Sequence, residues 1–243
     1  MSNKEIAQKY KRQTASRYLP VNKDEITSKI IESEKYAVST KYDGHLYLLS
    51  FNGEKVQLVN HGGNIITDLP MLKEANEVLS GSCKEILLAG ELYLFEEGER
   101  TRSFDMTSQL DEKSSAIYFA AFDILSLDGE EVNLNIVALN EKLNQLLSGG
   151  KSLHAVKNSL VESRKDIALL YKDLVQDGGQ EGVIVRSDNG PIYKIKPYFQ
   201  KLLMPLLKFL RRLGVSPNSI TLLSIILSFV LCCFSLCFGV YSY

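Results

Sequence analysis

Lys41 stands beside Tyr42, Asp43 and Gly44, between two strand-like runs of the chain. A lysine amine acts as a nucleophile only when it is neutral, so a reactive lysine needs a site that favours loss of its proton. An aspartate and a glycine next to it fit a tight turn that presents the amine to a phosphate. Taken alone, K-x-D-G is also typical of an ordinary solvated turn, and both interpretations stay open at this point.

Further charged residues stand in or beside apolar, strand-like runs: Glu91, Glu181, Lys194 and Lys196. Each by itself fits a charge on the solvated face of an edge strand, but a buried acid is costly unless it is paired or bound to a metal. The two later lysines are two residues apart, so they share one face of a strand. Carboxylates hold Mg²⁺, lysines neutralise phosphates and an aromatic ring stacks on a base, so the set predicts a site for a nucleoside triphosphate and a divalent metal.

The elements that must position these residues are mostly short strands. Alternating or β-branched runs predict strands at 36–38, 46–51, 56–59, 86–95, 116–124, 182–186 and 192–195. Helical periodicity predicts helices at 67–80, 136–148 and 151–176. Strands that pair through hairpins, with helices packed outside, predict an α+β fold of mainly antiparallel sheets.

Five segments in order, KYDG, GELYLF, FDILSLDG, EGVIVR and YKIKP, resemble the nucleotidyltransferase motifs of ATP-dependent DNA ligases. The same superfamily includes RNA ligases and mRNA capping enzymes. The resemblance covers roughly residues 15–198 and implies a ligase-like adenylation domain at 1–198 with the ligase-type nucleotidyltransferase fold. It also implies ATP and Mg²⁺, or another divalent metal, as cofactors. The implied activity is that of an enzyme that forms a lysyl-AMP intermediate for phosphodiester strand joining in DNA repair or recombination.

The resemblance assigns catalytic roles to four residues, Lys41, Asp43, Lys194 and Lys196. Lys41 attacks the α-phosphate of ATP, releases pyrophosphate and forms a phosphoramidate with AMP. Asp43 and Gly44 shape the nucleophile turn, with Asp43 near the ribose or the attacking lysine. Lys194 and Lys196 hold the α-phosphate and stabilise its developing charge. AMP then passes to the 5′-phosphate of nicked DNA, or of RNA, and a 3′-hydroxyl displaces it.

Three residues are implied to bind the nucleotide and the metal. Glu91 contacts the ribose and supports metal binding, and Phe122 stacks on adenine. Glu181 coordinates the catalytic metal. The cofactor-binding set implied by the resemblance therefore consists of Lys41, Gly44, Glu91, Phe122, Lys194 and Lys196, and the metal-binding set of Glu91 and Glu181.

The sequence departs from the DNA-ligase pattern in several places. Ser39 stands where an acidic residue usually precedes the lysine, and Leu46 where an arginine usually follows the glycine. An S-R-x-G element is replaced by Asn60–Gly63, in which His61 is expected to be a residue of a hairpin loop. These departures leave open an RNA ligase, or a nucleotide-binding membrane module that has lost ligation. The OB-fold domain implied after the last lysine motif is not recognisable, so a partner that supplies its function is expected.

The composition changes after Pro197. Residues 199–215 predict an amphipathic basic linker helix, and residues 216–243 predict a transmembrane helix, because 220–240 carry no charge and are long enough to cross a bilayer. A last helix packed on the preceding domain is the alternative for 199–215. Nearby positive charge on the N-terminal side predicts a single-pass membrane protein with a cytoplasmic N-terminal domain. The same segment resembles the start of CDP-alcohol phosphatidyltransferases and suggests a fragment of such a fusion, although their Asp-rich motif is missing.

Composition excludes some classes of protein. Cys83 is the only cysteine in residues 1–198, which excludes a disulfide framework or a cysteine zinc site in that part and indicates a reducing compartment. The formal net charge is −1, and the positive charges after Phe199 leave residues 1–198 with an acidic surplus. Bulk charge therefore argues against a tight grip on DNA by this domain alone, because strong nucleic-acid binders usually carry a basic surplus.

Overall fold

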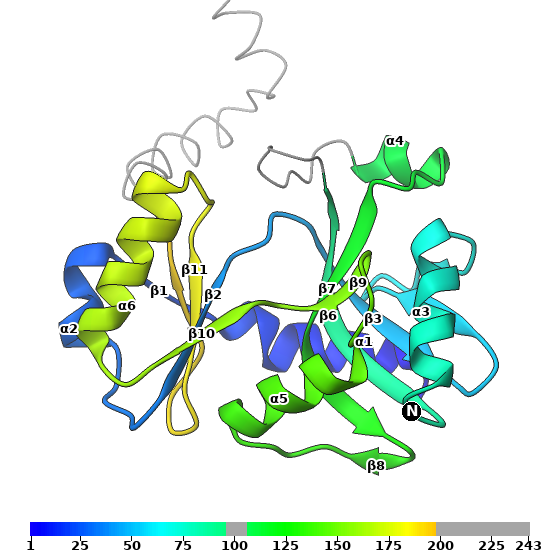
Figure 1. Cartoon of the computed structure of the whole chain (residues 1–243), viewed down its shortest axis with the longest axis horizontal. Helices are drawn as coiled ribbons and strands as arrows, with labels where there is room; N and C mark the ends of the chain where they lie inside the picture. Colours follow the sequence, from blue (N-terminus) through cyan, green and yellow to red (C-terminus); the bar gives the residue numbers. More distant parts are fainter. Residues whose placement is uncertain (96–105, 198–243) are drawn as a thin grey trace, which may run out of the picture. The chain divides into compact units, whose positions relative to one another are not determined.

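The strands assort into two sheets (Figure 1). The computed structural model describes residues 1–95 and 106–197, within a compact unit that runs from Met1 to Pro197. Sheet A has five strands in the order β1-β12-β11-β2-β10, and only β1 and β12 pair in parallel. Its strands are β1 (Leu19–Val21), β2 (Tyr36–Thr40), β10 (Asn158–Val161), β11 (Val183–Arg186) and β12 (Tyr193–Ile195).

Sheet B has seven strands, six of them in the order β5-β4-β3-β6-β7-β8, with β9 paired in parallel to β7. Its strands are β3 (His45–Phe51), β4 (Val56–Val59), β5 (Ile65–Ile66), β6 (Ile86–Leu94), β7 (Ile117–Leu127), β8 (Glu130–Glu131) and β9 (Leu153–Ala155). The register of β6 on β7 shifts between Leu87 and Leu88 and again between Ala89 and Gly90. Such irregularities bend a strand and redirect its side chains, and here they lie next to Glu91.

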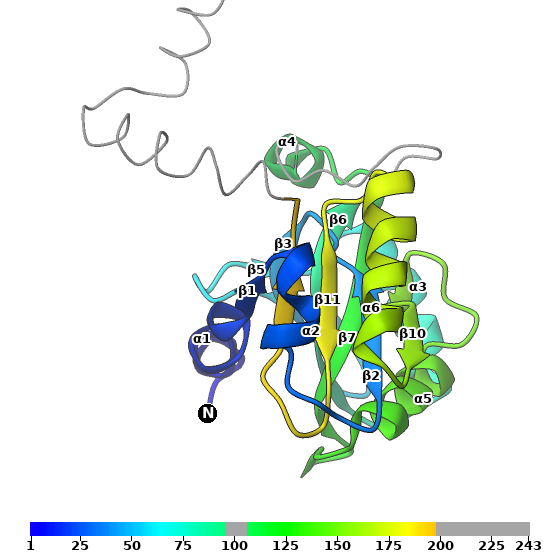
Figure 2. The ribbon, with the colours of Figure 1, turned by 90° about the vertical axis from the view of Figure 1, so that its left-hand side faces the viewer.

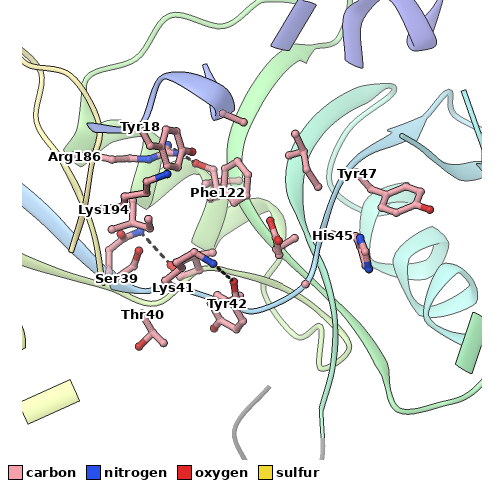
Figure 3. A pocket seen from close by; sticks show the side chains of 18 of the residues that line it. Tyr18, Ser39, Thr40, Lys41, Tyr42, His45, Tyr47, Phe122, Arg186 and Lys194 are labelled. Atoms are coloured by element: carbon pink, nitrogen blue, oxygen red, sulfur yellow. Dashed lines mark hydrogen bonds between the residues drawn. The ribbon is translucent and has the colours of Figure 1, made fainter. Parts of the chain in front are cut away.

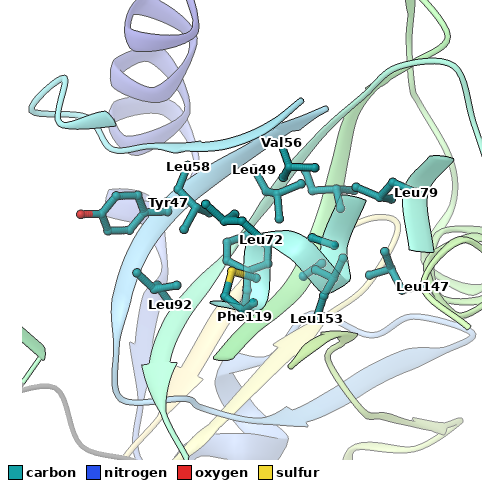
Figure 4. Close-up of a cluster of buried hydrophobic side chains, with 14 of the residues drawn as sticks. Tyr47, Leu49, Val56, Leu58, Leu72, Leu79, Leu92, Phe119, Leu147 and Leu153 are labelled. Carbon is teal, nitrogen blue, oxygen red and sulfur yellow. The ribbon is translucent and has the colours of Figure 1, made fainter. Parts of the chain in front are cut away.

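The larger core lies on one face of sheet B. Figure 4 shows strand residues such as Leu49 and Phe119 against Leu72 and Leu79 of α3 (Pro70–Ser80). Helix α5 (Ile136–Leu146) adds Leu139 and Leu143 to the same core. On β3, for example, the core residues Tyr47, Leu49 and Phe51 alternate with residues on the opposite face, as the pleat requires.

The opposite face of sheet B is covered in part by α1 (Asn3–Gln13). Ser2 caps this helix with Glu5 in a reciprocal capping box. Ala7 and Tyr10 pack on Leu48, Leu87 and Ala89 of the sheet. The rest of that face lines the candidate functional site described below.

Sheet A is covered on its outer face by α2 (Ile26–Lys29) and α6 (Arg164–Tyr171), which lie in front of β11 in Figure 2. The second core holds Val38, Val183 and Val185 of the sheet against Ile167 and Tyr171 of α6. A π-helical turn (Lys172–Asp177) extends α6. The remaining helices are α4 (Met106–Asp111) and the 3₁₀ turns Ala15–Arg17 and Lys23–Glu25.

The predicted α+β fold of mainly antiparallel sheets is confirmed. The predicted helix at 151–176 is wrong in its first half, where the chain forms β9 and β10 before α6 begins. Two tertiary contacts explain the difference. Glu74 of α3 accepts hydrogen bonds from the backbone N–H groups of Lys151, Ser152 and Leu153, and β10 pairs with β2.

The structure corrects the predicted location in a membrane with a cytoplasmic N-terminal domain. Within residues 1–95 and 106–197, no helix combines the length and the apolar character that crossing a bilayer requires. The predictions of a linker helix at 199–215 and a transmembrane helix at 216–243 fall outside the described residues.

Candidate functional site

Lys41 lies where the chain leaves β2 of sheet A to enter sheet B (Figure 3). Its backbone N–H donates to the carbonyl of Gly182 at 2.9 Å, which fixes the start of the turn. Its Nζ donates to Glu181 Oε2 at 2.5 Å and to the carbonyl of Tyr42 at 3.2 Å. The amine is therefore held at the junction of the two sheets with a defined direction.

Glu181 holds two lysines with one carboxylate. It is 7% exposed, its Oε2 accepts from Lys41, and its Oε1 accepts from Lys196. Burial by itself raises the pKa of Glu181, but the hydrogen bonds and charges of Lys196 and Lys41 outweigh burial and hold that pKa below its usual value. Glu181 is therefore an anion that bridges two amines.

Lys194 belongs to a row of side chains that crosses sheet A. The cross-strand row consists of Asn158 on β10, Ser39 on β2, Ile184 on β11 and Lys194 on β12, which are successive register partners. Directly opposed residues share one face of a sheet, and all four line one pocket. Burial, and then the charges of Lys196 and Lys41, lower the pKa of Lys194.

Glu91 enters the site from sheet B, on the face opposite to the large core. Burial raises its pKa to about 7; the charges of Lys41 and Lys11 oppose that shift, whereas Glu181 and Asp43 reinforce it. Within residues 1–95 and 106–197, the side chain of Glu91 makes no hydrogen bond, although its backbone belongs to β6. It is a partly buried carboxyl group that lines the pocket and is available to a ligand.

Phe122 is held by two side chains that the sequence did not single out. Arg186 donates through Nη1 to the carbonyl of Phe122 at 2.8 Å, and its Cζ lies 5.2 Å from the centre of the Phe122 ring. Figure 3 shows the two side chains next to each other. Tyr10 of α1 stacks on the ring with centroids 6.5 Å apart and donates to Asp123 at 2.9 Å. An arginine at the end of a strand was the only signal for this arrangement in the sequence.

Asp43 and Gly44 complete the nucleophile turn. Asp43 lies close enough to Glu91 to contribute to the raised pKa of that carboxyl group. A Cβ atom at Gly44 would overlap the backbone carbonyl of Leu92 on β6, so the turn can approach sheet B only if this residue is glycine.

These residues surround a pocket of about 350 Å³, a size typical of small-molecule sites. Both sheets line it, together with α1 and α5. Pocket residues that sequence analysis gave no binding role include Lys11, Tyr18, Asn60, His61, Ile136, Leu139, Asn140, Leu143, Val156, Asn158 and Arg186. His61 lies in the β4–β5 connection, as expected for a hairpin residue, and also borders the pocket. Of the eight predicted site residues, the lining includes Lys41, Gly44, Glu91, Phe122 and Lys194. Glu181 contacts Lys41, Lys196 contacts Glu181, and the charge of Asp43 acts on Glu91.

The donor set fits a metal that arrives with a nucleotide. Within the described residues, no group of three or more His, Cys, Asp or Glu side chains is placed to hold a metal ion. The two predicted ligands, Glu91 and Glu181, are both at the site, and both oxygens of Glu181 already accept from lysines. Mg²⁺ commonly uses one or two carboxylates together with substrate phosphates, so these residues suit an ion whose other ligands come from ATP.

The fold and the site define a ligase-type nucleotidyltransferase domain. The chain belongs to the family described as "ATP dependent DNA ligase domain", which matches residues 18–203. A "Probable DNA ligase" of Dictyoglomus turgidum is 23% identical over 171 residues, which are 65% of this chain and 28% of that protein. A second "Probable DNA ligase", from Dictyoglomus thermophilum, is 27% identical over 104 residues, or 42% of this chain and 17% of that protein.

Two solved structures share the fold. The structure titled "Pmar-Lig_PreS3" has a TM-score of 0.58 and 18% identity, and the match covers 81% of this chain and 51% of that one. The structure "mycobacterial DNA ligase D complexed with ATP and MES" has a TM-score of 0.51 and 23% identity, with 68% and 56% covered. The chain thus spans little more than half the length of these structures and less than a third of the curated relatives.

Proposed function

We propose that this domain transfers AMP from ATP to Lys41 as the first step of nucleic-acid strand joining. The observation that carries the proposal is the contact of the Lys41 amine with Glu181, 2.5 Å away, beside Lys196 and next to a pocket of suitable size for a nucleotide. Of the three lysines at the site, Lys41 is the one that both contacts Glu181 and lines the pocket, since Lys196 does not line it and no contact joins Lys194 to Glu181.

The chemistry follows from these contacts. The Lys41 amine, once neutral, forms an N–P bond to the α-phosphorus while the bond from that phosphorus to the bridging oxygen breaks and pyrophosphate leaves. Before the attack, the ammonium group of Lys41 passes one proton to Glu181 Oε2, which accepts its hydrogen bond. Lys194 and Lys196 stabilise the negative charge that develops on the α-phosphate. A divalent metal bound with the phosphates by Glu91 and Glu181 would supply further positive charge there.

Nicked DNA is the acceptor that we propose for the second step. Both curated relatives carry the name DNA ligase, and the family is that of the ATP-dependent DNA ligase domain. In this scheme a 5′-phosphate oxygen attacks the AMP phosphorus, the N–P bond breaks, and Lys41 is regenerated. A 3′-hydroxyl then forms the phosphodiester and AMP leaves.

The full chain incubated with Mg²⁺ and ATP labelled at the α-phosphate tests the first step. The wild-type chain and a Lys73→Arg control, whose lysine is exposed on α3, are expected to take up acid-labile label. Lys41→Arg keeps the charge but lacks a usable amine, and should take up none. Label on Lys41→Arg, or its absence from the wild type, would contradict the proposal. Transfer of the label to a nicked duplex tests the acceptor separately.

A further inference from the structure

We propose that Asn158 and Asn140 form the base-reading end of the pocket and select adenine over guanine, an inference that rests on the proposed function. Both residues line the pocket, Asn158 from β10 and Asn140 from α5. Neither belongs to the motifs that carry the family resemblance. They are joined to each other by a hydrogen bond from Asn158 Nδ2 to Asn140 Oδ1 at 3.0 Å.

The hydrogen bonds fix which way each amide points. Asn158 Nδ2 donates both to Asn140 Oδ1 and to the carbonyl of Val156, at 3.1 Å, so both of its hydrogens are used. A flipped amide would place Oδ1 against two oxygens and lose both bonds. Asn140 Oδ1 accepts from Asn158 and, at 3.4 Å, from Asn144. Each amide is therefore locked with one group committed to the protein.

The remaining amide groups form a donor–acceptor pair. Asn158 Oδ1, an acceptor, and Asn140 Nδ2, a donor, have no hydrogen-bond partner within residues 1–95 and 106–197. Adenine presents an amino donor at N6 next to an acceptor ring nitrogen, which matches this pair. Guanine presents an oxygen at that position beside an N–H donor, so it would set oxygen against oxygen and donor against donor.

The position of Asn158 agrees with a nucleotide that lies along the cross-strand row. Lys194, at one end of the row, is next to Lys196 and Lys41, where the phosphates are proposed to bind. Asn158 stands three strands away, at about 14 Å for strands spaced by 4.7–4.9 Å, which suits the extended length of a nucleoside phosphate. Ser39 lies between them and is small, so it leaves the Asn158 amide accessible from the pocket.

Apolar side chains surround this end of the pocket. Val156 lines it from the segment before β10, and Leu139 and Leu143 line it from α5, while Ile184 lines the pocket farther along the cross-strand row. A planar base fits such walls, and removal of water strengthens the contrast between a matched and a mismatched hydrogen-bonding edge. An amide pair at the end of an apolar slot therefore reads the base more strictly than the same pair in solvent.

The test compares ATP with GTP, each labelled at the α-phosphate, at concentrations below saturation. The full-length wild type should be labelled by ATP at least roughly tenfold faster than by GTP. Asn158→Ala and Asn140→Ala should slow labelling by ATP roughly ten- to a hundredfold and leave labelling by GTP nearly unchanged. Alanine suits the α5 position, so Asn140→Ala retains the helix. Gln145→Ala, on an exposed position of α5, is the matched control and should keep the wild-type ratio.

A second readout does not depend on catalysis. AMP should raise the midpoint of thermal unfolding of the wild type more than GMP, and Asn158→Ala should reduce that difference. If no nucleotide labels the protein but AMP still stabilises it more than GMP, the proposed function fails and the base selection stands. The base selection is wrong if ATP and GTP label the wild type equally fast, or if both asparagine variants keep the wild-type ratio of the ATP rate to the GTP rate. This conclusion holds whether or not Lys41 is the labelled residue.

Discussion

At the scale of single residues, the site is organised by two carboxyl groups in opposite electrostatic states. Glu181 is held ionised by Lys196 and Lys41, whereas burial raises the pKa of Glu91 to about 7. The ionised Glu181 orients the amines of Lys41 and Lys196. Because the pKa of Glu91 is close to neutral pH, Glu91 is able to bind a partner either as a neutral acid or as a carboxylate. Two acids with separated pKa values are typical of sites that bind and move charge.

Glu91→Gln tests the state of the second carboxyl group. Because its pKa is raised to about 7 in the folded protein, the folded state keeps a proton that the unfolded chain loses above about pH 4.5. The associated stability is complete below that pH and is lost as the pH rises through 7. One pKa unit corresponds to about 1.4 kcal/mol, so the free energy of unfolding should favour Glu91→Gln over the wild type by roughly 3 kcal/mol more at pH 8 than at pH 4.

Urea unfolding at a series of pH values measures this difference. Glu141→Gln, at an exposed position of α5, is the control and should follow the wild type throughout. If the free energies of unfolding of Glu91→Gln and of the wild type differ by a constant amount from pH 4 to pH 8, the pKa of Glu91 is not raised.

The residues that meet at the candidate site could be predicted from the sequence, but their contact partners could not. Lys41, Glu181, Lys194 and Lys196 stand in recognisable motifs, and the structure brings them together. Glu181 was expected to be a metal ligand, and its contacts with two lysines were not foreseen. Arg186, Asn140 and Asn158 act through hydrogen bonds between elements distant in the chain, and such bonds leave no periodic signal in a sequence.

At the scale of elements, the nucleophile turn depends on the close approach of Gly44 to β6. Gly44→Ala would place a methyl group on the carbonyl of Leu92, and backbone does not yield as a flexible side chain does. We expect the variant to lose about 1–3 kcal/mol of stability and to label at least tenfold more slowly. Gly81→Ala, at the end of α3, meets only Val78 at 3.9 Å and should be close to neutral. Equal labelling rates for the two variants would show that the turn tolerates a side chain.

The sequence pattern predicts the ranges of β3 and β4 well. It predicts the range 151–176 poorly, because tertiary contacts determine the secondary structure there. The run at 56–59 has the same limits in the structure as in the sequence pattern, and the run at 46–51 is extended only to His45. The range 151–176 was predicted as one helix because its apolar residues permit that period. Glu74 and the edge of β2 instead hold its first part as strands, a tertiary effect that local propensity does not contain.

At the scale of the whole domain, the pocket takes side chains from both sheets, so a nucleotide should stabilise the fold as one unit. An ATP analogue that cannot be split between the α- and β-phosphates should raise the unfolding midpoint. At a hundred times its dissociation constant, the gain in free energy of unfolding is about 2.7 kcal/mol. A midpoint that does not move at millimolar analogue, measured by scanning calorimetry, would contradict nucleotide binding between the sheets.

The most direct measurement of the central claim is the site of covalent modification. The full chain is incubated with ATP and Mg²⁺, digested under conditions that preserve a phosphoramidate, and its peptides are mapped by mass spectrometry. The account predicts one added AMP group on the peptide that holds Lys41, at the side-chain nitrogen, and unmodified peptides around Lys194 and Lys196. AMP found on a different residue, with Lys41 unmodified, would contradict it.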